Sequence, residues 1–140
     1  MPKVIDLKEP KPGTSEYKVL EQLKTKISHR DWVIIHSLKS RYNTKNVEGE
    51  IDFVVFIPNK GMIIIEVKGA DGFIVDKKGW TLKGVNKGQE HTDPFEQISS
   101  GEWAIRHSIR RLEIDDYGIP ISRIVWFPKI EEDLTRIKEN

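Results

Sequence analysis

The sequence predicts an α/β protein in which helices flank a mixed β-sheet. Two apolar, β-branched runs, Ile51–Ile57 and Met62–Val67, flank the turn signal Pro58–Gly61. They predict a central hairpin over residues 50–57 and 62–68. Helix-start signals and further apolar runs lie on both sides of this hairpin. Because helical and strand patterns alternate along the chain, we expect one sheet covered by helices on its faces.

The segment before the hairpin predicts a helix and a strand. Residues 1–13 contain Pro10 and Pro12 and are expected to form an extended lead-in. Thr14 or Ser15 can cap a helix that runs to about Ile27. Trp32–Leu38 is an apolar run and a predicted strand, and the polar stretch after it predicts a loop over residues 39–48.

Short strands and a loop are expected after the hairpin. Phe73–Val75 and Trp80–Leu82 predict two short strands, followed by a loop over residues 84–90. Ile121–Phe127 predicts the last strand. We expect this strand and Trp32–Leu38 to extend the sheet on either side of the hairpin.

A second helix has a clear start. Asp93 is the expected N-cap, Pro94 takes the first helical position, and Glu96 completes a capping box. The helix is predicted to run to about Leu112. Its expected buried residues are Phe95, Ile98, Ile105, Ile109 and Leu112.

The composition indicates one globular domain. The chain has 140 residues, of which 37% are hydrophobic, and we expect a domain over residues 14–128 followed by a polar tail or further element over residues 129–140. The absence of cysteine excludes disulfides and thiolate metal sites. No apolar run reaches membrane-spanning length, so a cytoplasmic protein without membrane contact is expected. A net charge of +1 implies that any nucleic-acid binding must use a local basic patch.

Three charged residues interrupt the otherwise apolar hairpin at its open end. Side chains alternate faces along a strand, and the odd-numbered positions of the hairpin are all apolar. The even-numbered positions include Asp52, Glu66 and Lys68. A three-residue loop, Asn59–Gly61, with Gly61 in a left-handed conformation would place Asp52 opposite Lys68, on the same face as Glu66. A two-residue turn would instead place Asp52 on the face opposite Glu66.

A fourth charged residue, Glu16, falls on the buried stripe of the first predicted helix. Its position lies one turn before Leu20, which is on the apolar face with Leu23 and Ile27. One interpretation is a carboxylate that interacts favourably with the positive end of the helix dipole. The other is a carboxylate directed towards a site.

The charged end of the hairpin has the residue types that phosphodiester hydrolysis requires. Carboxylates supply the hard oxygen ligands that Mg²⁺ prefers, and a lysine beside them can orient water or neutralise charge on the phosphate. The alternative is a cross-strand ion pair between Asp52 and Lys68. Such a pair contributes at most about 1 kcal/mol, which gives little reason to interrupt a core strand.

These residues resemble a known family. Asp52, followed by thirteen residues and then Glu66-Val67-Lys68, with the helix carboxylate Glu16 upstream, is similar to the PD-(D/E)xK nuclease superfamily. Within it, the pattern resembles the nuclease-related domain, NERD. The further matching motifs are Ile51-Asp52, Gly61–Lys68, Gly72, Trp80 and Pro94-Phe95-Glu96-Gln97.

The resemblance implies a restriction-endonuclease-like fold and DNA cleavage that depends on Mg²⁺ or Mn²⁺. Asp52, Glu66 and Glu16 would then bind the metal, and Lys68 would be catalytic. Gln97 would lie near the site, although a solvent-exposed glutamine is an equal alternative. Glu50 could also approach the metal, but a solvated strand end is favoured.

DNA is the expected partner, in processing, repair or defence. Basic residues of the loop and of the late helix are the candidate phosphate contacts, namely Lys39, Arg41, Lys45, Arg106 and Arg110. The alternative function is a non-catalytic DNA-binding or targeting module associated with a helicase or another DNA-processing protein. The oligomeric state is left open, a dimer included.

Other catalytic classes lack their motifs. The chain has no Gly-x-x-x-x-Gly-Lys-Ser/Thr and no Gly-x-Ser-x-Gly sequence. Its histidines are not spaced as metal ligands, and His36, inside an apolar run, is expected to be a core or edge histidine.

Overall fold

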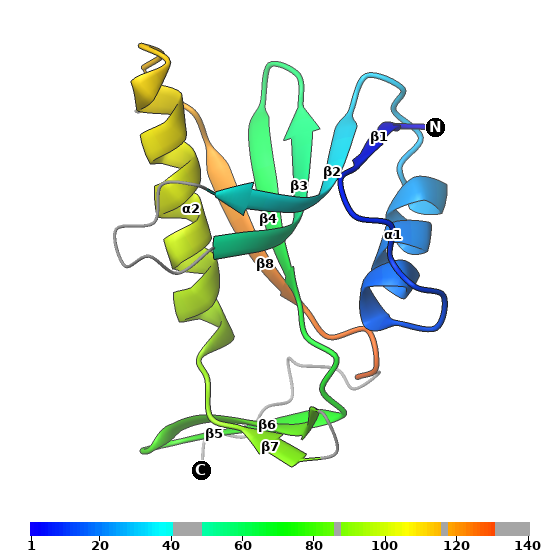
Figure 1. Ribbon diagram of the computed structural model, residues 1–140, viewed down its shortest axis with the longest axis vertical. Helices are drawn as coiled ribbons and strands as arrows, with labels where there is room; N and C mark the ends of the chain where they lie inside the picture. Colours follow the sequence, from blue (N-terminus) through cyan, green and yellow to red (C-terminus); the bar gives the residue numbers. More distant parts are fainter. Residues whose placement is uncertain (41–48, 86–87, 116–117, 131–140) are drawn as a thin grey trace.

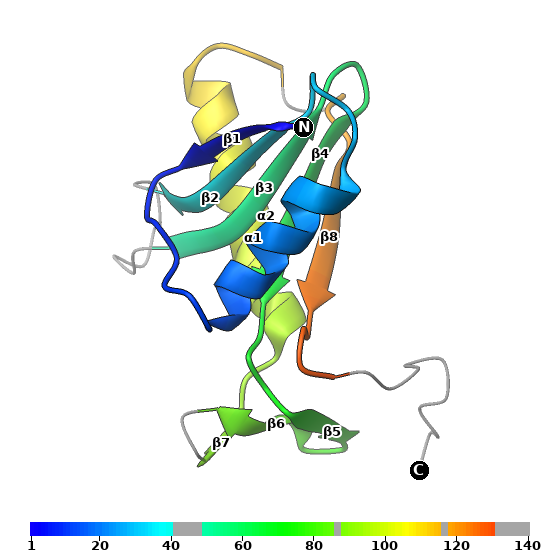
Figure 2. The ribbon, with the colours of Figure 1, turned by 90° about the vertical axis from the view of Figure 1, so that its right-hand side faces the viewer.

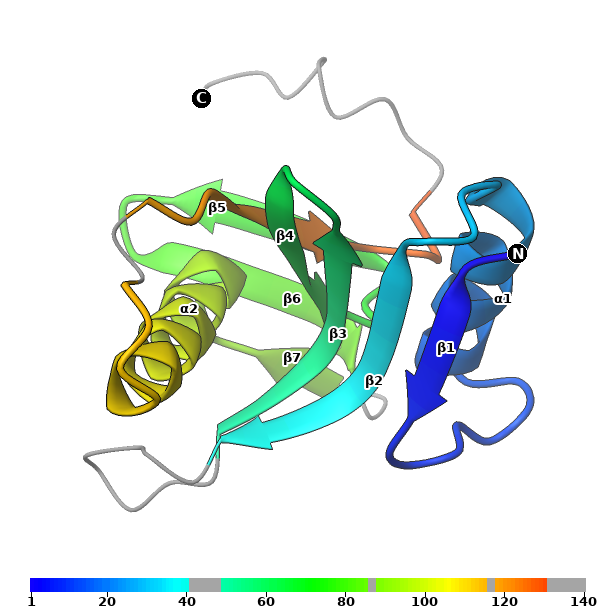
Figure 3. The ribbon, with the colours of Figure 1, turned by 90° about the horizontal axis from the view of Figure 1, so that it is seen from above.

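The fold is α/β, with a mixed five-stranded sheet, a three-stranded sheet and two helices. The computed structural model describes residues 1–40, 49–85, 88–115 and 118–130. In Figure 1 the helices α1 and α2 stand on opposite sides of the larger sheet, and Figure 3 shows the same layers from above. The elements are β1 (Lys3–Asp6), α1 (Ser15–Lys26), β2 (Val33–Ser40), β3 (Gly49–Ile57), β4 (Gly61–Val67), β5 (Gly72–Asp76), β6 (Gly79–Val85), β7 (Gly88–Glu90), α2 (Pro94–Arg111) and β8 (Ile121–Trp126).

The larger sheet has the order β1-β2-β3-β4-β8, so the predicted central hairpin is confirmed. The prediction that further strands flank the hairpin is also confirmed. β2 pairs antiparallel with β3, while β8 pairs parallel with β4. The segment expected as an extended lead-in contains β1, which pairs parallel with β2 from Lys3 to Asp6.

The predicted register of the hairpin was wrong by two residues. The loop is Pro58–Lys60, and Ile57 pairs with Gly61 rather than Pro58 with Met62. Asn59 takes the left-handed conformation at a φ of 63°, and the backbone N–H of Lys60 donates to Ile57 O at 3.0 Å. Proline followed by a residue with positive φ is the pattern of a type II turn, which explains why the loop closes one residue early. The loop still has three residues, so between Phe53 and the turn the even-numbered residues of both strands stay on one face.

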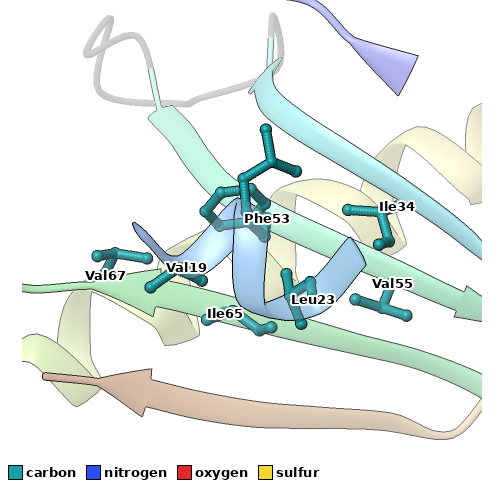
Figure 4. Packing of buried hydrophobic residues seen from close by; sticks show 8 residues of the cluster. Val19, Leu23, Ile34, Phe53, Val55, Ile65 and Val67 are labelled. Carbon is teal, nitrogen blue, oxygen red and sulfur yellow. The ribbon is translucent and has the colours of Figure 1, made fainter. Parts of the chain in front are cut away.

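Each face of the hairpin packs against a different helix. Phe53, Val55, Ile65 and Val67 form one core with the apolar face of α1, as Figure 4 shows. The even-numbered apolar residues form a second core with Ile98 and Ile105 of α2; they are Val54, Met62 and Ile64. Alternation therefore sorts the hairpin side chains largely as expected.

The alternation breaks at Ile51. This residue packs in the core on the α2 side, whereas Phe53 packs on the α1 side. Opposite this point in β2, Ser37 has a φ of 62°, which is unusual for a residue with a side chain. The pairing passes from His36 opposite Phe53 to Leu38 opposite Ile51. Asp52 thus lies where the regular strand geometry is interrupted.

Both predicted helix starts are confirmed. The side chain of Thr14 accepts a hydrogen bond from Tyr17 N, and that of Asp93 accepts one from Phe95 N. Two expected core residues of α2 are not buried: Phe95 is 47% exposed and Leu112 is 71% exposed. Phe95 instead lies against Trp80, with ring centroids 5.6 Å apart, and Leu112 is the C-cap, beyond the part of the helix that faces the sheet.

The smaller sheet, β5-β6-β7, lies beyond the end of β4 (Figure 2). The predicted strands β5 and β6 are confirmed, but residues 88–90, expected within a loop, form β7. Phe73 stacks on Phe127 and contacts Trp80, so this sheet has its own small aromatic core. No helix within the described residues is long and apolar enough to cross a membrane.

Candidate active site

The hairpin strands separate at the charged end. The β3–β4 pairing stops at Phe53 opposite Ile65. Beyond this pair, the backbone N–H of Val67 donates to Asp52 Oδ2 at 2.8 Å. In a regular sheet, a backbone carbonyl of the neighbouring strand would accept this hydrogen bond. The carboxylate of Asp52 is therefore fixed between the two strands by a charge-assisted hydrogen bond.

Three carboxylates converge beside this opening. Glu16, Glu50 and Asp52 each place one carboxylate oxygen so that all three lie within 4.8 Å of one another. Glu16 comes from the first turn of α1 and is half-buried, as its position on the apolar stripe predicts. Glu50 is exposed, and the interpretation of this residue as a solvated strand end missed its place beside the other two. The break in alternation at Asp52 and Ser37 is what brings Glu50 into this group.

Glu66 and Lys68 lie together at the end of β4. Lys68 Nζ is 3.6 Å from Glu66 Oε1 and 3.9 Å from Glu90 Oε1, and the side chain of Lys68 is 13% exposed. The ion pair between Asp52 and Lys68, the alternative to a metal site, is not formed, because the β3–β4 pairing ends at Phe53 opposite Ile65 and Lys68 lies beyond it. Glu90, the last residue of β7, was not anticipated, since its strand was not predicted.

The crowding of partly buried carboxylates changes their pKa values. Burial, followed by the negative charge of Glu66, raises the pKa of Asp52 to about 7, although the hydrogen bond from Val67 opposes the shift. Burial also raises the pKa of Glu66, despite the opposing effect of Lys68. Glu16 and Glu50 add to both shifts. A positive charge placed here would relieve this repulsion.

Two residues of β2, His36 and Ser37, contact the acidic group formed by Glu16, Glu50 and Asp52. His36 is completely buried, with Nδ1 at 2.8 Å from Asp6 Oδ1 and Nε2 at 2.7 Å from Glu16 Oε2. Ser37 Oγ donates to Glu50 Oε1 at 2.7 Å. Burial lowers the pKa of His36, but the hydrogen bonds to the two carboxylates outweigh burial, and the pKa is raised. The sequence indicated a core or edge histidine but not its carboxylate partners.

A pocket of about 390 Å³ opens beside the acidic group. Glu16, His36 and Val67 line it, together with Lys8 and Lys11 of the segment before α1. Neither lysine was among the predicted basic residues, because both lie in the lead-in segment.

The remaining candidate residues are spread over the molecule. Gln97 is exposed in the first turn of α2, and Lys39 is exposed opposite Glu50 in the β2–β3 pairing. Arg106 donates to Ile119 O and contacts Glu102, near the turn end of the hairpin, and Arg110 lies one turn further away from the charged end. Arg41 and Lys45 lie outside the described residues.

A mixed α/β sheet with carboxylates gathered beside a lysine has the organisation of a nuclease-like domain. Residues 12–128 match the family model of the nuclease-related domain, NERD. The chain therefore belongs to the nuclease-related domain family, and the matched residues include Glu16, Asp52, Glu66 and Lys68. Comparisons with curated proteins and with solved structures give no match.

Proposed function

We propose that this domain is a PD-(D/E)xK-type nuclease that hydrolyses DNA phosphodiester bonds with a divalent metal ion, in DNA processing, repair or defence. The observation that carries the proposal is the convergence of Glu16, Glu50 and Asp52 within 4.8 Å, next to a lysine held by Glu66. Membership of the nuclease-related domain family supports the same class of reaction.

The donor set fits Mg²⁺ or Mn²⁺. The ligands available are all carboxylate oxygens, which hard divalent cations prefer, and no thiolate competes. Glu16 and Asp52 would hold the ion, with Glu66 as the third predicted ligand and Glu50 as a further one. When bound, the ion polarises a phosphoryl oxygen and lowers the pKa of a water molecule.

Three residues of the chain have separate proposed roles in the reaction. Asp52, fixed by Val67 N–H, provides a ligand that needs no rearrangement. The ammonium group of Lys68 lies beside Glu66 at the end of β4. There it can orient the attacking water or neutralise charge that develops on the phosphate. Gln97 is proposed to assist from the start of α2.

Basic residues near the pocket are the favoured contacts to the DNA backbone. Lys8 and Lys11 line the pocket beside Glu16, and Lys39 lies opposite Glu50. Arg41 and Lys45 remain proposals from the sequence. Arg106 and Arg110 would contact DNA only if it extended towards the turn end of the hairpin, since Arg106 lies beside Ile119.

A cleavage assay tests the proposal. Purified protein is incubated with plasmid and oligonucleotide DNA in Mg²⁺ or Mn²⁺, and wild type is compared with Asp52→Asn and Lys68→Ala. Each variant is expected to lose at least about 100-fold in cleavage rate, because each lacks a group that stabilises the transition state. Asp31→Asn and Lys26→Ala, on the exposed surface, serve as controls and should cut like wild type. Equal cleavage by all variants would contradict the assignment.

A second candidate is a non-catalytic DNA-binding module, attached to a helicase or another DNA-processing protein. One observation favours it: Glu16 and Asp52 already have protein partners, His36 and the Val67 N–H. Wild-type protein that binds DNA and cuts it with neither metal would support this function and exclude the first.

A further inference from the structure

The strand β1 lies before the residues that match the family, yet its last residue is joined to the candidate active site. Asp6 of β1 contacts His36, and His36 contacts Glu16. We propose that Asp6 and His36 are positioning residues that hold the Glu16 carboxylate towards Asp52 and Glu50, so that β1 is part of the site. This inference rests on the proposed function in treating Glu16 as a metal ligand.

The contacts of His36 fix its ring completely. Both ring nitrogens face carboxylate oxygens, at 2.8 Å for Asp6 and 2.7 Å for Glu16, and carboxylates are acceptors. A ring that donates to both is an imidazolium, and both hydrogen bonds are then charge-assisted. The side chain is 1% exposed, so water does not compete for either nitrogen.

Neighbouring strands hold the ring in place from both sides. The β1–β2 register places Asp6 opposite His36, and the β2–β3 register places His36 opposite Phe53. The Phe53 ring stacks on the imidazole, with centroids 4.7 Å apart. Since Phe53 directly follows Asp52 in β3, the ring is anchored to the same part of β3 that carries Glu50 and Asp52 of the acidic group.

Glu16 needs such an anchor. Its side chain is 37% exposed and lies among carboxylates that repel it, so an unanchored Glu16 would turn towards solvent. A carboxylate has two oxygens, so Glu16 can accept from His36 and keep lone pairs for a cation. Outer hydrogen bonds of this kind commonly affect metal affinity by about 10–100-fold.

The test separates the nitrogen contacts from the packing. His36→Phe keeps a ring against Phe53 but removes both donors, His36→Gln can restore one donor, and Asp6→Asn alters only the outer contact. His29→Phe is the matched control, because His29 also stacks on an aromatic ring, Trp32, away from the acidic group. Folding of each variant is checked by circular dichroism and thermal unfolding.

Two readouts are measured. Mn²⁺ affinity without DNA, from electron paramagnetic resonance, should fall about 10–100-fold in His36→Phe, less in His36→Gln and Asp6→Asn, and not in His29→Phe. In cleavage, kcat should fall with KM for DNA nearly unchanged. A folded His36→Phe protein with wild-type Mn²⁺ affinity would overturn the proposal.

A crystal structure of metal-free His36→Phe separates this inference from the proposed function. We expect the Glu16 carboxylate to move away from Asp52 and Glu50. If wild type neither binds Mn²⁺ nor cuts DNA, the proposed function fails, while the position of Glu16 still decides the role of His36. Glu16 retained beside Asp52 in this variant would refute positioning by His36.

Discussion

The two ends of the central hairpin are built from the same strands but are organised in opposite ways. At the turn end, β3 and β4 are fully paired, and Met62 N–H donates to Pro120 O at 3.0 Å. At the open end, the pairing stops after Phe53, and the Asp52 side chain accepts the hydrogen bond of Val67 instead. The turn end buries apolar side chains on both faces, whereas the open end gathers carboxylates.

This difference shows that the turn end stabilises the domain, whereas the open end destabilises it. Buried apolar side chains at the turn end each contribute about 1.5–3 kcal/mol. The open end holds two partly buried carboxylates, Asp52 and Glu66, whose raised pKa values mean that their charged forms destabilise the fold. Sites that bind ligands often carry such a cost.

The largest effect on stability is expected at the turn end, from Gly61→Ala. Gly61 has a φ of 130°, and a Cβ there would lie 2.2 Å from Pro120 O. We expect the free energy of unfolding in urea to fall by about 2–4 kcal/mol, from backbone strain and the clash with β8's lead-in. Gly79→Ala, with a φ of 109° and nothing within 4 Å, should lose only about 1 kcal/mol. Equal losses would show that the close approach of Pro120 does not matter.

At the open end, Asp52→Asn should stabilise the metal-free protein. The folded pKa of Asp52 is about 7 against an ordinary value of 3.8, so the folded state binds more protons than the unfolded state between these values. Stability therefore falls as pH rises from about 4 to about 7. The variant lacks this penalty and should gain about 1–3 kcal/mol in urea unfolding at pH 8, and nothing at pH 4.

Glu21→Gln is the control for this pH dependence, because Glu21 is a partly exposed residue of α1 whose ion pair with Lys24 is a surface pair. It should change the free energy of unfolding by less than about 0.5 kcal/mol at both pH values. A destabilised Asp52→Asn protein at pH 8 would mean that the acidic group does not strain the fold.

The smallest effect, a change in kcat, is expected from Glu90→Gln. This variant tests whether β7 of the smaller sheet contributes to the site. Lys68 lies between Glu66 and Glu90, and removing the charge of the more exposed partner should loosen Lys68 without displacing it. The expected change is about a 2–5-fold fall in kcat, matching an ion pair worth under about 1 kcal/mol. Glu96→Gln, exposed in α2, is the control. A loss as large as that of Lys68→Ala would give Glu90 a direct part in the reaction.

The parts of the fold that depend on local sequence patterns were predictable. The hairpin follows from alternating apolar residues, and the α2 start follows from Asp93-Pro94. The strands β1 and β7 are short and polar, and they form only through pairing with neighbouring strands that the sequence does not specify. The hairpin register was missed because Asn59 as well as Gly61 has a positive φ, and the turn closes with Ile57 opposite Gly61.

The candidate site was predictable in its main residues but not in its surroundings. Asp52, Glu66 and Lys68 stand out because charges in a core strand are costly. Glu50 and Ser37 join the site through an irregular backbone at Ser37, which alternation rules cannot anticipate. His36 has the burial expected of a core histidine, and only the packing of β1 and α1 reveals its partners.

The most direct test of the central claim is to locate a bound ion. Crystals grown with Mn²⁺ can be measured at a wavelength where manganese scatters anomalously. We predict an anomalous peak within reach of the carboxylate oxygens of Glu16 and Asp52, at the open end of the hairpin. A peak elsewhere, or none at a saturating Mn²⁺ concentration, would contradict the claim that this end of the hairpin is a metal centre.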